Sequence, residues 1–85
     1  MKEVEVEVEV EINDNDGRWE LWFFLTTPDD RRTGHYYSVL GMVKAYPQFR
    51  EEILAACRKL YGSLPGDHHA RLDRAIARAE MGGVK

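Results

Sequence analysis

The chain has 85 residues and a formal net charge of −3, with 44% hydrophobic and 32% charged residues. This length allows one small domain, and the composition is typical of a globular protein rather than a disordered one. No apolar run approaches the roughly 20 residues that span a bilayer, and we expect no signal peptide and no membrane contact. Cys57 is the single cysteine, which argues against a disulfide framework. We therefore expect a cytoplasmic protein with a single domain over residues 1–85.

The acidic residues are concentrated near the N-terminus. Residues 1–16 contain seven acids and one base, whereas residues 17–85 contain eleven bases and eight acids. Five glutamates alternate there with aliphatic residues: Glu3, Glu5, Glu7, Glu9 and Glu11. A period of two predicts a β-strand from about Lys2 to Ile12 with one apolar face and one carboxylate face. Neighbouring carboxylates lie about 6.7 Å apart, so each pair repels by roughly 0.6 kcal/mol in unscreened water.

The second predicted strand begins directly after a turn. Asp16-Gly17 is a strong hairpin signal because both residue types tolerate positive φ, and it predicts a second strand from Arg18 to about Thr26. The hairpin then covers residues 2–27. The strand is apolar on both faces, which indicates cover on both sides or a central position in a sheet.

The register of this hairpin depends on the turn. A two-residue turn pairs Glu9 with Phe24 and Glu11 with Trp22, so that these aromatic residues share the carboxylate face. A turn with one bulged residue would exchange the partners and place the valines opposite Trp22 and Phe24. We favour the two-residue turn.

The remaining part, about residues 28–81, is expected to be mainly helical. Thr27 and Pro28 resemble the cap and first position of a helix that continues through Asp29 and Asp30. Residues 35–46 permit two interpretations. Helical spacing favours a helix with these residues on one face: Tyr36, Val39, Leu40, Val43 and Tyr46. The same stretch is rich in strand formers and contains Gly41, so a third strand beside the second remains an alternative.

Two further helices are more clearly indicated. Pro47 begins the first, Gly62 ends it, and its buried face carries Phe49, Ile53, Ala56, Cys57 and Leu60. Asp67 caps the last helix, which runs to about Met81 with these residues inward: Leu72, Ala75, Ile76 and Ala79. The order of elements predicts an α+β fold, in which an N-terminal antiparallel β-hairpin or three-stranded meander packs against two or three C-terminal α-helices.

No catalytic, cofactor or metal motif stands out. His68 and His69 are adjacent, so on a helix they point about 100° apart and cannot share one ion. Cys57 lies on an apolar helix face, where a cysteine behaves as a small hydrophobic residue. We therefore expect no enzymatic activity, no cofactor and no bound metal.

Three interpretations of the carboxylate face remain open. It is a solvated face that discourages edge pairing, a surface for a basic protein, or a surface neutralised by the chain's own cations. Arg71, Arg74 and Arg78 occupy one stripe of the last helix and are candidates for that neutralisation. Trp22 and Phe24 are either packed under another element or exposed at the centre of an interface.

We predict a non-enzymatic protein-interaction module. It would be a small acidic inhibitor or adaptor of the phage or mobile-element type, such as an anti-CRISPR, that binds a basic, nucleic-acid-handling protein. The predicted partner-binding residues are Glu3, Glu5, Glu7, Glu9, Glu11, Trp22 and Phe24. Direct nucleic-acid binding is disfavoured because phosphate needs a positive surface.

Two further interpretations accompany this one. The alternative function is none at all, in an idealised or de novo designed α+β domain, which the Glu–Val alternation favours. Cys57 and Gly41 argue against that alternative, since designs avoid such residues. Exposed edge strands are also compatible with a homodimer.

Overall fold

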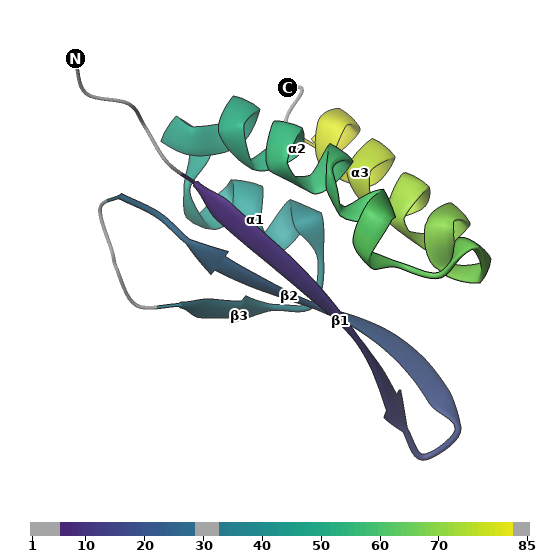
Figure 1. Ribbon diagram of the computed structural model, residues 1–85. Helices are drawn as coiled ribbons and strands as arrows, with labels where there is room; N and C mark the ends of the chain where they lie inside the picture. The colour runs from purple at the N-terminus through teal and green to yellow at the C-terminus, as the bar shows by residue number, and fades with distance from the viewer. Residues whose placement is uncertain (1–5, 29–32, 83–85) are drawn as a thin grey trace.

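The computed structural model describes residues 6–28 and 33–82, and its strands precede its helices (Figure 1). The described strands form one three-stranded antiparallel sheet in the order β1-β2-β3: β1 (Glu7–Asn15), β2 (Arg18–Thr26) and β3 (Gly34–Tyr36). Three α-helices follow: α1 (Val39–Ala45), α2 (Arg50–Arg58) and α3 (His69–Gly82). Short 3-10 helices connect them: η1 (Pro47–Phe49), η2 (Leu60–Ser63) and η3 (Gly66–His68). The predicted α+β fold is confirmed, in its three-stranded form.

The β1–β2 hairpin closes through a two-residue turn. Asp16 has a φ of 59° and Gly17 a φ of 81°, the pair of left-handed conformations that a tight hairpin turn requires. The backbone N–H of Gly17 also donates to the Asp14 carboxylate at 3.0 Å. The register pairs Glu9 with Phe24 and Glu11 with Trp22, so the favoured register is confirmed.

Residues 35–46 contain both a strand and a helix. β3 pairs with the end of β2, with Tyr36 opposite Phe23 and Gly34 opposite Leu25. The Ser38 hydroxyl then accepts from the Gly41 N–H at 2.9 Å and caps α1. The predicted helix was therefore right for the second half of this stretch and wrong for the first, where pairing with β2 prevails. The helix predicted through Asp29 and Asp30 lies outside the described residues.

The helices pack on one face of the sheet (Figure 1). α2 contacts β1, while α3 packs against α1 and α2. The core between the two layers includes Phe23, Leu25, Met42, Ile53 and Leu72, each at most 2% exposed. The last predicted helix is confirmed as α3, although Asp67 lies inside η3 rather than capping α3, because a 3-10 turn precedes the helix. The single helix predicted from Pro47 to Gly62 was too long: Pro47 begins η1, α2 covers only Arg50–Arg58, and Gly62 lies within η2.

The turn end of the hairpin extends beyond the helical layer (Figure 1). Trp19, near that end, is 51% exposed and its ring meets the His68 ring edge-on at 5.9 Å between centroids. This contact joins the far part of β2 to η3, so the projecting hairpin is still supported by the helical layer.

Candidate functional site

The face of the sheet that is turned away from the helices is acidic and aromatic. Side chains alternate between the two faces of a strand, so burial of Val8, Phe23 and Leu25 leaves their neighbours on the opposite side. No helix or strand within residues 6–28 and 33–82 covers that side (Figure 1). We call this surface the outer face and define it by Glu7, Glu9, Glu11, Glu20, Trp22, Phe24, His35 and Tyr37.

Three carboxylates follow one another along β1. Glu7, Glu9 and Glu11 are all exposed, and no ion pair joins any of them to another described residue. Their cross-strand neighbours are Thr26, Phe24 and Trp22 respectively. Glu9 and Glu11 therefore lie directly opposite the aromatic residues of β2, at the cross-strand Cβ spacing of about 4.5–5.5 Å.

Four aromatic rings form a continuous cluster next to these carboxylates. The imidazole of His35 stacks on Phe24 with 5.1 Å between ring centroids and an interplanar angle of 16°. The same imidazole lies 4.7 Å from the Trp22 ring and 4.7 Å from the Tyr37 ring. Tyr37 meets Trp22 edge-on at 6.2 Å. His35 is thus the central ring of the cluster and joins β2 to the end of β3.

The cluster combines partial burial with accessible edges. Trp22 and Phe24 are half-buried, whereas Tyr37 is 69% exposed. The indole N–H of Trp22 donates to the Glu20 carboxylate at 3.0 Å, which holds the ring in one orientation. An ordered, amphipathic aromatic surface of this kind loses little conformational entropy on binding, because its rotamers are already restricted.

The described residues of the predicted site all lie on the outer face. Glu7, Glu9 and Glu11 stand beside Trp22 and Phe24, while Glu3 and Glu5 lie outside the described residues. The two aromatic residues are neither packed under a described element nor fully exposed.

His35 and Tyr37 were missed as members of this surface. Their alternation with the inward-facing Tyr36 was the available signal, and it becomes informative only once 34–36 is recognised as a strand.

The arginines of α3 form no ion pair with Glu7, Glu9 or Glu11 and therefore do not neutralise these carboxylates. Arg71 instead donates to the backbone carbonyl of Trp19. Arg74 and Arg78 make no ion pair with another described residue, and all three line a groove between α3 and β2 on the helical side of the sheet. The outer face and the arginine stripe therefore lie on different sides of the sheet and differ in charge, and Tyr37 borders both.

Cys57 is buried in the core, and His69 contacts backbone carbonyl groups. Burial raises the pKa of the fully buried Cys57 thiol to about 12, against a smaller opposing effect of the nearby Arg58 charge. His69 Nε2 lies 2.9 Å from the Tyr61 carbonyl and 3.1 Å from the Leu64 carbonyl, so a protonated Nε2 donates there. Within residues 6–28 and 33–82 no three His, Cys, Asp or Glu side chains form a metal-binding group.

Comparison of the chain with protein-family models, curated proteins and solved structures found no match. Among the described residues, no helix combines the length and the apolar character that crossing a membrane requires.

Proposed function

We propose that this chain is a non-enzymatic protein-interaction module that binds a basic, nucleic-acid-handling protein through the outer face. One observation carries the proposal: three exposed carboxylates stand in a row beside four clustered aromatic rings. A row of like charges opposes folding because its members repel one another. A cationic partner compensates that repulsion, and the adjacent rings supply the apolar contact area that a row of charges lacks.

The carboxylates and the aromatic cluster of the outer face contribute differently to binding in this proposal. The carboxylates select a basic partner and accelerate its approach, an effect that salt weakens. Their charge density is lower than that of a nucleic acid, with one charge per about 6.7 Å of strand against one per about 3.4 Å along each DNA strand. Electrostatic imitation of a nucleic acid alone is therefore a modest source of affinity, and the aromatic cluster supplies most of the remainder.

Occupation of a basic groove would turn such a module into an inhibitor. A groove that binds a phosphate backbone presents cations along an extended path, and the row from Glu7 to Glu11 is likewise extended along one strand. Bound there, the outer face would compete directly with the nucleic acid. An adaptor would use the same contacts on a basic surface that has no such competitor.

The proposal is tested by capture followed by direct titration. Immobilised wild-type chain and a Glu7→Gln, Glu9→Gln, Glu11→Gln variant are exposed to the same cell lysate, and retained proteins are identified and purified. We expect a basic nucleic-acid-binding protein to be retained by the wild type, released by duplex DNA, and bound at least tenfold more weakly by the variant in calorimetry. Phe24→Ala should weaken the same complex without changing its salt dependence.

A matched variant separates the outer face from net charge. Glu51→Gln, Asp67→Asn and Asp73→Asn remove the same number of exposed carboxylates from the helical part of the chain. This control should bind like the wild type. Equal affinity of the outer-face variant and the wild type for the purified partner would overturn the proposal, as would a partner that duplex DNA does not displace and whose binding ignores Phe24→Ala.

A further inference from the structure

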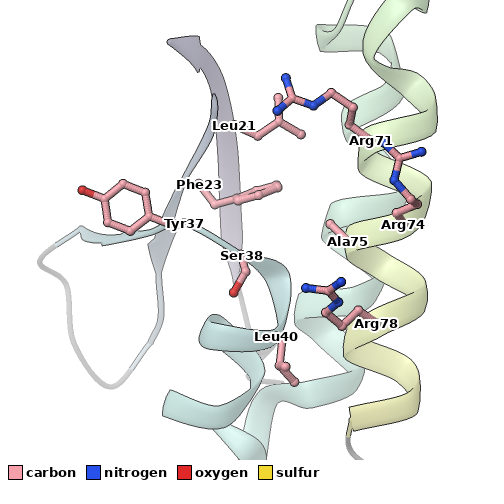
Figure 2. A pocket seen from close by; sticks show the side chains of 9 residues that line it. All are labelled: Leu21, Phe23, Tyr37, Ser38, Leu40, Arg71, Arg74, Ala75 and Arg78. Carbon is pink, nitrogen blue, oxygen red and sulfur yellow. The ribbon is translucent and has the colours of Figure 1, made fainter. Parts of the chain in front are cut away.

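A second surface, on the helical side of the sheet, combines cations with an apolar floor. The groove between β2 and α3 has a volume of about 300 Å³, and its lining includes Leu21, Phe23, Arg71, Arg74 and Arg78. Figure 2 shows Phe23 on its floor, with Arg71 and Arg78 reaching from α3 across the groove. An adjoining cavity of about 430 Å³ shares Leu21, Tyr37 and Arg71 and continues the groove past Trp19.

The groove follows an open strand edge. β3 pairs only with Phe23–Leu25, so the first half of β2 has β1 on one side and no described strand on the other. In an antiparallel hairpin with a two-residue turn, the pair flanking the turn is hydrogen-bonded and the bonded pairs then alternate. Trp19 and Leu21 consequently turn their backbone N–H and C=O groups away from β1. These groups face the groove and can pair with another extended backbone.

Arg71 already occupies one of these groups. Its guanidinium donates to the Trp19 carbonyl, which confirms that this carbonyl points away from β1. An incoming backbone N–H can replace that donor, and the released guanidinium then becomes available to a carboxylate, its stronger partner. Arg71 therefore protects the edge in the free protein and is positioned to pair with an acidic ligand in the bound one.

The charge of the groove selects the side chains of the ligand. Arg74 and Arg78 are exposed and make no ion pair with another described residue, and with Arg71 they follow one side of the groove. Side chains of an added strand alternate between the two sheet faces, so every second residue would face α3. Carboxylates at those positions complement the three guanidinium groups.

We propose that the open edge of β2 is a docking site for an acidic, extended peptide segment of a partner protein. The segment pairs its backbone with the open edge at Trp19 and Leu21 and directs carboxylates to Arg71, Arg74 and Arg78 along the groove. Recognition by strand addition explains why a backbone edge and a row of cations occur together. A phosphate backbone matches the cations but offers no N–H donors to the carbonyls of the edge.

The test uses a fluorescein-labelled seven-residue peptide that alternates threonine with glutamate, followed by fluorescence anisotropy. We expect saturable binding to the wild-type chain and at least tenfold weaker binding to the Arg74→Glu, Arg78→Glu variant. Lys44→Glu with Lys59→Glu is the matched control, because both lysines are exposed, lie outside the groove and change the net charge equally. This control should stay within threefold of the wild type. Circular dichroism melts verify that both variants fold.

Two further probes separate strand addition from ion exchange. Two peptides carry N-methyl groups at alternate backbone nitrogens, one in each register, and both keep every carboxylate. Successive N–H groups of a strand point to opposite edges, so one register blocks pairing with Trp19 and Leu21 and should lose binding, whereas the other leaves that edge free and should retain it. A labelled seven-residue thymidine oligonucleotide should bind more weakly than the glutamate peptide. Equal binding of both N-methylation registers and the unmodified peptide, tighter binding of the oligonucleotide, or the absence of saturable peptide binding would each overturn the proposal.

Discussion

Titration of Cys57 couples the stability of this fold to pH in the alkaline range. The thiol is 0% exposed, and burial raises its pKa from 9.0 to about 12. Above pH 9 the unfolded chain releases a proton that the native protein retains, so alkali favours unfolding. The free energy of unfolding therefore falls by about 1.4 kcal/mol per pH unit between the two pKa values. Below pH 9.0 the thiol makes no pH-dependent contribution to the free energy of unfolding. At about pH 10 the titration of the thiol lowers this free energy by about 1.4 kcal/mol.

Urea unfolding followed by tryptophan fluorescence measures this effect at about pH 7 and about pH 10. The control is Cys57→Ala, which removes the thiol and keeps every other titrating group. Tyr61, whose pKa is raised chiefly by its hydrogen bond to Asp73, contributes to both proteins and cancels in the difference. We expect the wild type to lose about 1.4 kcal/mol more than the variant over this interval. An equal loss in both proteins would refute the buried-thiol explanation.

Two further pairs of substitutions examine the hairpin turn and the two faces of the sheet. Gly17→Ala should lower the free energy of unfolding by about 1 kcal/mol, because Gly17 has a φ of +81°, a left-handed conformation that disfavours alanine. The added Cβ would meet nothing within 4 Å, so no steric clash adds to this cost. Gly62→Ala, which is equally uncrowded but lacks a positive φ, is the control and should be neutral or slightly stabilising in the same urea titration. Phe23→Ala should cost about 3–5 kcal/mol and Phe24→Ala only about 1 kcal/mol, since the first ring is in the core and the second is half-buried on the outer face. Similar costs for the two phenylalanines would contradict the assignment of the faces.

The hairpin could be predicted from local pattern because its determinants are local. Alternation in β1 defines two faces, and Asp16-Gly17 supplies the only two residues of the turn, so the partners of Glu9 and Glu11 follow by counting. The sequence therefore sufficed to predict that the carboxylates of β1 and the aromatic residues of β2 share one face.

β3 could not be predicted in the same way. It is three residues long, and its conformation is determined by pairing with Phe23–Leu25 rather than by its own period. Tyr36 fits a helical spacing with Val39 as well as it fits a strand facing the core. His35 and Tyr37 therefore escaped notice as members of the outer face. The arginine stripe was visible from helix spacing, but its position beside an open edge depends on how α3 packs.

The long sequence separation between α3 and β2 has a consequence for the order of folding. The β1–β2 hairpin closes through a two-residue turn, whereas Arg71 and Trp19 meet across a separation of 52 residues. Closing a long loop costs more chain entropy than closing a short one, so the hairpin can form early while the α3 contact waits for the intervening helices. The open edge of β2 would thus be exposed in early folding species, and the later docking of α3 would bring Arg71 to cover it.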